Sequence, residues 1–149
     1  MQRLKDTSFY KEALHEISYP FGNYFLFDGF VVAEVVEDVV FTWEQHGKKL
    51  TEDLTHLYDT NGEDLVFITN RVNPYSVQPA DWIYFFRQNY KLKGYAIVTY
   101  SDKEHLNAEL EKLFINTKFK RFRSLDDAIE WARKISGKRP MASLEKRNG

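Results

Sequence analysis

Short apolar runs alternate with segments of helical spacing along most of this 149-residue chain. Two β-rich runs, 24–27 and 30–36, come first, and further apolar runs follow at 65–69, 95–98 and 118–122. Helical patterns fill the gaps between the later runs. Strands that alternate with helices form parallel pairs joined by right-handed crossovers, so this order argues against all-helical and all-β folds.

The first two apolar runs flank Asp28 and Gly29. Asp-Gly between β-rich runs predicts a hairpin with a type I′ turn, because that turn needs φ > 0 at both central residues. The second run is apolar on both faces, which is typical of a central strand covered by helices on each side. We therefore predict an α/β fold: a mixed sheet of about five strands, with the N-terminal hairpin first, alternating helices and strands after it, and helices packed on the sheet.

Capping residues predict where the helices begin. Thr42 with Gln45, and Ser101 with Glu104, are spaced as capping boxes, in which each side chain bonds the other's free backbone N–H. Ser124 is expected to cap the last helix. Each helix has apolar residues at helical spacing. The first helix, expected to end at Asn61-Gly62, has Trp43, Leu50, Leu54, Leu57 and Tyr58, and the second, over about 80–91, has Trp82, Phe85, Phe86 and Tyr90. The helix that Ser101 opens has Leu106, Leu110, Leu113 and Phe114. The last helix, expected to end at Gly137, has the inward-facing residues Leu125, Ala128, Ile129 and Ala132.

One domain accounts for the chain. A length of 149 residues is enough for a single well-filled core, and 43% hydrophobic with 29% charged residues is ordinary for a globular protein. Residues 1–20 fit a helix or a strand, so residues 1–22 are set apart as an N-terminal extension. The domain itself is expected over residues 23–136. Residues 137–149 form a basic tail that is expected to be frayed.

Composition excludes several classes of function. The absence of cysteine removes disulfides, thiolate nucleophiles and cysteine-based zinc sites. A net charge of -1 argues against a dedicated nucleic-acid or membrane-surface protein. No apolar window approaches the roughly 18 residues of a membrane span, and the N-terminus lacks the apolar core of a signal peptide. These features predict a soluble, cytoplasmic protein.

No catalytic or metal-binding motif is recognisable. Glu52 shares a helix face with His56, but such pairs are usually solvated contacts, and no histidine has metal-ligand spacing. There is no P-loop, nucleophile elbow or dinucleotide fingerprint. We therefore expect no metal, no cofactor, no catalytic residue and no enzymatic activity. The histidines considered are His15, His46, His56 and His105.

Residues 64–82 are the place where we expect a function. The apolar run 65–69 leads into a polar loop, residues 70–76, and a helical pattern begins near Ala80. Free N–H groups at a helix start favour an anion, and Arg71 suits a bidentate clamp. The alternative is a loop whose side chains satisfy only its own turns. The candidate binding or switch residues are Asn70, Arg71, Asn73, Tyr75 and Ser76.

Two other features have both a functional and a structural interpretation. The run 118–123 interleaves Lys and Arg with Phe, as nucleic-acid-binding surfaces do, but a short edge strand whose charge prevents further pairing fits its context better. Trp82, Phe85 and Phe86 are suited to line a hydrophobic pocket. At helical spacing, such residues are more often ordinary core.

The order of elements and the C-terminal sequence resemble a known family. A strand that ends with Phe122 precedes a helix of sequence SLDDAIEWARK, which contains Ala128 and Trp131. This pattern is similar to that of the small STAS-like domains related to anti-sigma factor antagonists, over residues 23–136. A similar architecture occurs in CRAL-TRIO lipid-transfer domains. In the antagonists a partner kinase phosphorylates a serine in an Asp-Ser-x-Gly context after the third strand. Here Tyr75 precedes the matching Ser76 and no glycine follows, so only the location is carried over.

The resemblance implies a non-catalytic regulatory or protein-interaction module. Such a module would present the 70–76 loop to a protein partner. The alternative is a small-molecule or lipid-binding domain with an aromatic-lined pocket, whose ligand would be small and hydrophobic or anionic. Nucleic acid is not an expected partner. The sequence leaves open the partner or ligand, the oligomeric state and the phosphorylation of Ser76.

Overall fold

The computed structural model describes residues 1–137, and its centre is a six-stranded sheet with the order β1-β2-β3-β5-β7-β8. Strand β2 is antiparallel to both β1 and β3, whereas β3, β5, β7 and β8 run parallel to one another. The predicted mixed α/β sheet is therefore confirmed, with one strand more than the five expected. The strands are β1 (His15–Tyr19), β2 (Gly22–Leu26), β3 (Phe30–Val35), β5 (Val66–Asn70), β7 (Gly94–Val98) and β8 (Lys118–Phe122).

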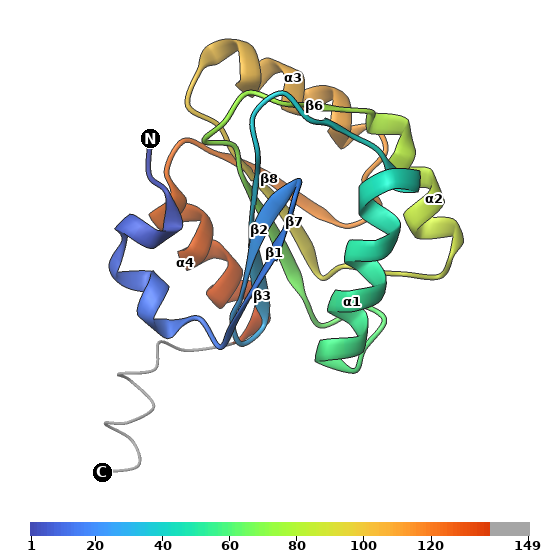
Figure 1. The fold of residues 1–149 in the computed structure, drawn as a ribbon, viewed down its shortest axis with the longest axis horizontal. Coiled ribbons are helices and arrows are strands. Elements are labelled where there is room, and N and C mark those ends of the chain that lie inside the picture. Colours follow the sequence, from blue (N-terminus) through green and yellow to red (C-terminus); the bar gives the residue numbers. More distant parts are fainter. Residues whose placement is uncertain (138–149) are drawn as a thin grey trace.

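Helices cover both faces of the sheet (Figure 1). One face carries α4 (Leu125–Ser136) and the N-terminal 3-10 turns η1 (Leu4–Asp6) and η2 (Ser8–Glu12). The opposite face carries α1 (Lys48–Tyr58), α2 (Trp82–Arg87) and α3 (Asp102–Lys112). Strand β3 is buried along its whole length, as its apolar sequence predicts. The helices therefore enclose two cores, one on each side of the sheet.

The predicted hairpin joins β2 to β3, in a register that pairs Tyr24 with Ala33. Its turn, however, is not type I′, since Gly29 has φ 87° but Asp28 is not among the residues with positive φ. The backbone N–H of Phe27 donates to the carbonyl of Phe30 at 2.9 Å and closes the turn. The strand pairing was predictable from the flanking apolar runs, whereas the turn geometry was not.

The first 22 residues contribute to both the sheet and the core. Strand β1 pairs with β2 at the edge of the sheet, so this segment supplies the sixth strand. Leu4 is fully buried against Phe25 and the α4 side of the sheet. Its backbone N–H donates to the Glu34 carboxylate at 2.8 Å. The segment set apart by sequence as an extension is thus packed onto the rest of the chain.

The predicted N-caps are present, and in one of the two predicted capping boxes another residue takes the place of the expected partner. Thr42, Ser101 and Ser124 each accept a hydrogen bond from the backbone N–H three residues later. The reciprocal bond from Thr42 N goes to His46 Nδ1 at 3.0 Å rather than to Gln45. His46 can take this place because the chain after Thr42 starts as a π-helical turn, η3 (Trp43–Gly47), before α1 begins.

Two helix ends differ from the predictions. Helix α1 ends at Asp59, which is left-handed at φ 53°, rather than at the Asn61-Gly62 pair. The helix expected over about 80–91 is shorter, because a 3-10 turn, η4 (Pro79–Asp81), precedes it and Asn89 is left-handed at φ 67°. Helix α4 ends at Gly137 as predicted. The tail prediction concerns residues beyond 137, outside the described part of the chain.

The face of helix α3 that packs against the sheet is not the face on which its leucines lie. Leu106, Leu110 and Leu113 are 69%, 56% and 77% exposed, whereas Ala108 and Glu111 are buried against the sheet. The buried glutamate is possible because β5, β7 and α2 supply hydrogen-bonding partners, described below.

Strand β8 lies at the edge of the sheet, the position that the structural interpretation of the basic run 118–123 predicted. Lys118 and Lys120 are exposed, while Arg121 pairs with Glu109 of α3 at 3.0 Å. Charged side chains on an edge strand oppose pairing with another chain. On the α1 side, two short strands, β4 (Val40–Phe41) and β6 (Ser76–Val77), pair with each other in parallel.

Candidate functional site

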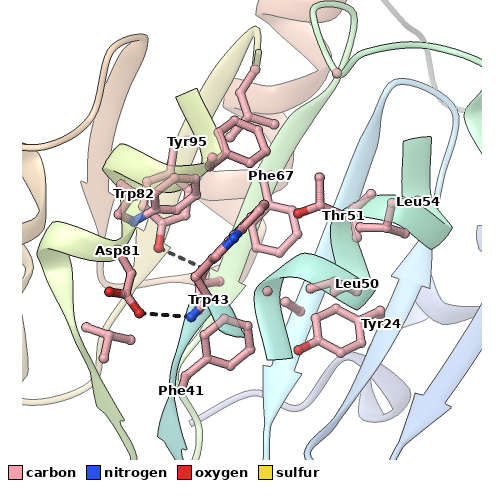
Figure 2. Close-up of a pocket in the computed structure, with 18 of the residues that line it drawn as sticks. Tyr24, Phe41, Trp43, Leu50, Thr51, Leu54, Phe67, Asp81, Trp82 and Tyr95 are labelled. Carbon is pink, nitrogen blue, oxygen red and sulfur yellow. Dashed lines mark hydrogen bonds between the residues drawn. The ribbon is translucent and has the colours of Figure 1, made fainter. Parts of the chain in front are cut away.

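A cavity of about 130 Å³ lies between the sheet and the helices α1 and α2 (Figure 2). Side chains of β2, β3, β5 and β7 form its floor, and those of η3, α1, η4 and α2 form its walls. Most of the lining is apolar, and many of its residues are aromatic. The aromatic residues of the lining are Tyr24, Phe41, Trp43, Phe67, Tyr75, Trp82, Phe85 and Tyr95.

The floor of the cavity is made by residues that alternate along the strands. Ala33 and Phe67 point to this face, and Val32 and Ile68 point to the α4 core. Phe67 belongs to a strand with paired neighbours on both sides, yet it is only partly buried. A phenylalanine on a central strand is ordinarily covered. Its exposure shows that the helices leave this part of the sheet open.

One hydrogen bond and a glycine fix how the walls of the cavity pack. The backbone N–H of Trp43, at the start of η3, donates to the Asp81 carboxylate at 2.8 Å and so links the entrance of α1 to that of α2 (Figure 2). A Cβ on Gly47 would lie 3.2 Å from the Trp43 ring and 3.5 Å from the Phe41 ring. The glycine therefore lets both rings pack against the helix at the cavity wall.

The polar end of the cavity is built around Glu111, which α3 buries beside the end of β5. Its carboxylate accepts a hydrogen bond from Arg71 within a buried ion pair. The Tyr95 hydroxyl donates to Glu111 at 3.1 Å, and the Trp82 indole N–H lies at 3.3 Å. Thr69 in turn donates to the Tyr95 hydroxyl at 3.2 Å. A buried carboxylate with several donors is held in place and is compensated for its lost hydration.

Two buried polar atoms in the cavity lining have no hydrogen-bond partner within residues 1–137. They are the Nε of Arg71 and the hydroxyl of Tyr24. Burial is the largest reason why the pKa of Tyr24 lies well above its ordinary value, and Tyr75 is the next. Burial alone would lower the pKa of Arg71, but Tyr75 and Glu111 outweigh it, so the guanidinium stays charged.

The five residues predicted from the 70–76 loop have three different positions. Arg71 and Tyr75 line the cavity, with the guanidinium 5.5 Å from the centre of the Tyr75 ring. Asn70 is buried on the other side of the sheet, where it donates to Glu34 and to the carbonyl of Gln2. Asn73 holds the N-terminus and β3, and Ser76 is exposed in β6. The structure therefore brings only Arg71 and Tyr75 together.

Two carboxylates, those of Glu111 and Asp81, lie beside the groups from which an anion site was expected at this loop. The Nη2 of Arg71 donates to the Glu111 carboxylate. Helix α2 has six residues and starts after a 3-10 turn whose Asp81 places a carboxylate there. A negative charge beside a helix start competes with any added anion.

Several cavity residues were not recognisable from sequence as site residues. Tyr24, Trp43 and Tyr95 fit their predicted strands and helix simply as core residues, because a lining aromatic has the same spacing as a packed one. Glu111 carries no local signal, since a glutamate in a helix is ordinarily on the surface. The sequence signal for this cavity was the prediction that Trp82, Phe85 and Phe86 could line a hydrophobic pocket. Trp82 and Phe85 do line the cavity, whereas Phe86 does not.

The described residues offer no other site of recognised chemistry. Within residues 1–137, no group of three or more His, Asp or Glu side chains is arranged to hold a metal ion. In the same range, no helix combines the length and the apolar character needed to cross a membrane.

Comparison with known structures identifies the architecture. A crystal structure of an uncharacterised protein of the DUF3478 family from Shewanella loihica PV-4, described as having a SpoIIAA-like fold, superposes on 79% of this chain and 90% of its own with a TM-score of 0.51. This fold is SpoIIAA-like. The sequence identity is 11%, so the similarity concerns the fold alone. No protein-family model and no curated protein matches the sequence.

The comparison agrees with part of the resemblance seen in the sequence. SpoIIAA-like describes the STAS fold of the anti-sigma factor antagonists, which the order of elements predicted. The comparisons give no support to the CRAL-TRIO likeness. The chain therefore has a SpoIIAA-like fold, with a cavity between its sheet and two of its helices.

Proposed function

We propose that this STAS-like module is non-catalytic and binds a small apolar molecule in the cavity between the sheet, α1 and α2. The cavity itself is the observation that carries the proposal. Ligand sites are mostly apolar, concave and lined by aromatic side chains with a few placed polar groups. This cavity combines apolar and aromatic walls with one polar end at Arg71 and Glu111.

The volume restricts the ligand. An enclosed cavity of about 150 Å³ holds a benzene-sized molecule. At about 130 Å³, this cavity is suited to a small ring or a short aliphatic chain rather than to a membrane lipid. Burial of an apolar ligand contributes roughly 25 cal/mol to the binding free energy per Å² of apolar surface removed from water. A small ligand bound in this way is expected to have micromolar to millimolar affinity.

Titration with a panel of small uncharged aromatic and aliphatic molecules tests this proposal. Two-dimensional amide NMR is the measurement, because shifts can be assigned to the cavity residues. Binding should perturb Trp43, Phe67 and Trp82, and an Ala33→Leu variant should abolish it by filling the floor. An Ala80→Leu variant, at an exposed position outside the cavity lining, is the matched control. If no compound in the panel shifts the cavity residues, the proposal is wrong.

A second candidate function is a protein interaction through the outer side of the 70–76 loop. Pro74 and Ser76 are exposed there, beside the cavity wall formed by Tyr75 and Val77. A Ser76→Arg variant would place a bulky charge on this surface, and Ser8→Arg would do the same at an exposed position on η2, on the opposite face. Affinity capture from lysate should lose specific partners with Ser76→Arg only. Identical partner lists for both variants would exclude the loop as the interface.

A further inference from the structure

Residues 2–4 are held against the sheet in the way that domains hold a bound peptide. They lie beside α4, on the face of the sheet opposite the cavity (Figure 1). Leu4 is fully buried, whereas the residues on either side of it are exposed. Its backbone N–H donates to the Glu34 carboxylate at 2.8 Å, and the carbonyl of Gln2 accepts from the Asn70 side chain at 2.7 Å. Main-chain hydrogen bonds combined with a pocket for one side chain are typical of peptide recognition.

The side chains that hold this segment also bond to one another. The Nδ2 of Asn70 donates to Glu34 at 2.8 Å, and the Tyr100 hydroxyl donates to the Oδ1 of Asn70 at 2.6 Å. The three residues come from the end of β3, the end of β5 and the position just after β7, on three neighbouring strands. None of these bonds involves the N-terminal segment. The arrangement is therefore organised in advance, which lowers the cost of binding.

The place of this group in the sheet is one where α/β folds bind ligands. Strands β3, β5 and β7 run parallel, and the three side chains lie at their carboxyl ends. Without a segment over them, the carboxylate of Glu34 and the amide of Asn70 would lose one partner each, and the pocket of Leu4 beside Phe25 would be open to water. A second peptide with the same features restores all three contacts.

We propose that Glu34, Asn70, Tyr100 and the pocket of Leu4 form a peptide-docking site, which the N-terminal segment of the same chain occupies and from which a segment of a partner protein displaces it. The attachment in cis buries one side chain and is tethered at one end only, so a segment in trans competes with it through its concentration. The site lies on the face opposite the cavity and does not depend on ligand binding there.

The contacts of the N-terminal segment define the chemistry of the partner segment. Its anchor is an apolar side chain of leucine size, because the pocket holds Leu4 completely. The guanidinium of Arg3 donates to the Oδ1 of Asn73 at 2.9 Å at the exposed rim, so a basic residue directly before the anchor adds a contact. The remaining bonds go to backbone atoms and set no further requirement on sequence.

Hydrogen exchange of the unaltered protein tests whether the segment leaves the site. The Leu4 amide is buried and bonded to Glu34 while the segment is in place. If the segment opens locally, this amide should exchange at least about a hundredfold faster than that of Ile68, which is fully buried on the central strand β5. Exchange of both amides at the same rate would mean that the segment leaves only on global unfolding, and this would overturn the proposal.

A synthetic peptide of residues 1–7 tests the site itself. Leu4→Glu in the full chain places a charge in the apolar pocket and should vacate it. In amide NMR titration, the peptide should bind this variant at least about tenfold more tightly than the wild type, in which the tethered segment competes. The shifts should include Phe25, Glu34 and Asn70. The same peptide with Leu4→Glu is the matched control and should not bind.

A change at Tyr100 tests the hydrogen bonds of the site. The Tyr100 hydroxyl also donates to the carbonyl of Gln2, at 3.3 Å. Tyr100→Phe, added to the Leu4→Glu chain, should weaken peptide binding about fivefold, the effect of one net hydrogen bond. Tyr84→Phe, at an exposed position on α2, is the control and should leave the affinity unchanged.

The remaining outcomes each decide against the proposal. If the peptide does not bind the folded Leu4→Glu chain, the site does not accept a segment in trans. Equal binding of the control peptide would show that no leucine pocket is used. A wild-type dimer that Leu4→Glu dissociates would place a second copy of this chain, rather than a different protein, in the site and would contradict the partner assigned here.

Discussion

Arg71 and Glu111 form a buried ion pair that joins the end of β5 to the last turn of α3, across 40 residues of sequence. Both side chains are almost completely buried, and the carboxylate also accepts bonds from Tyr95 and Trp82. The pair closes the polar end of the cavity. Because a charge buried without its partner is strongly unfavourable, the two residues are expected to be energetically coupled.

Removing one member of this pair should destabilise the fold. Glu111→Leu leaves the Arg71 guanidinium buried without its partner, and a loss of about 3–5 kcal/mol in the free energy of unfolding is expected. The double variant Arg71→Met/Glu111→Leu should lose less than the sum of the two single variants, because neither charge is left unpaired. Urea unfolding of all four proteins measures the coupling.

Glu109→Gln is the control for the ion-pair prediction. Glu109 lies on the same helix and pairs with Arg121 at 3.0 Å, with both side chains partly exposed. An exposed pair contributes about 0–1 kcal/mol, so this change should have little effect. Additive effects of Arg71→Met and Glu111→Leu would contradict the coupling between the two residues.

The buried carboxyl group of Glu34 should make the free energy of unfolding depend on pH. Burial raises the pKa of Glu34 above its ordinary value of 4.5. The folded state therefore binds this proton more tightly than the unfolded state does. The contribution of Glu34 to stability is fully present below about pH 4.5 and is lost as the pH rises through the raised pKa.

A Glu34→Gln variant tests this prediction. The backbone N–H of Leu4 and the side chain of Asn70 both donate to one oxygen of Glu34, at 2.8 Å each, so the amide oxygen of glutamine can accept both. The variant should unfold at higher urea concentration than the wild type at neutral pH, with the difference shrinking towards about pH 4. Glu37→Gln, at an exposed position after β3, is the control. A difference that does not depend on pH would contradict the assignment.

Much of the fold could be predicted because its signals are local. The caps at Ser101 and Ser124 depend on side chains that bond within their own turn. The strand–helix alternation depends on spacings of two and about 3.6 residues, which are visible in one segment at a time. Strand β1 was left undecided because its residues are half exposed and fit a helix as well as a strand. Its identity is decided by pairing with β2.

The site was less predictable because its parts come together only in the folded chain. Arg71 was found from its place after a central strand, but its partner Glu111 lies on a helix whose apparent apolar stripe faces outward. The cavity depends on the small side chains of Ala33, Gly47 and Thr51, which come from three elements. Small residues at such positions give no pattern in sequence, since packing density is a property of all neighbours together.

Two glycines with positive φ should respond differently to alanine. Gly62 has φ 104°, and a Cβ there would lie 2.0 Å from the carbonyl oxygen of Lys91. Gly137 has φ 72°, with no atom of the described chain within 4 Å of that position. Gly137→Ala should cost about 1 kcal/mol from backbone conformation alone. Gly62→Ala should cost more than about 3 kcal/mol, because backbone must move. Thermal unfolding measures both, and equal losses would contradict the close approach of the 59–65 turn to Lys91.

Ala33 and Ala96 provide a direct test of the cavity through stability alone. Both are almost completely buried on central strands, but Ala33 lies on the cavity floor and Ala96 faces the core under α4. A larger side chain at Ala96 has no space, so Ala96→Leu should lose about 1–3 kcal/mol in the free energy of unfolding. Ala33→Leu should be neutral or gain up to about 1 kcal/mol, because its added carbon atoms fill the cavity and bury apolar surface. Urea unfolding of the two variants makes the comparison. Equal destabilisation would mean that the space above Ala33 is as densely packed as the α4 core. The proposal of a binding site there would then be wrong.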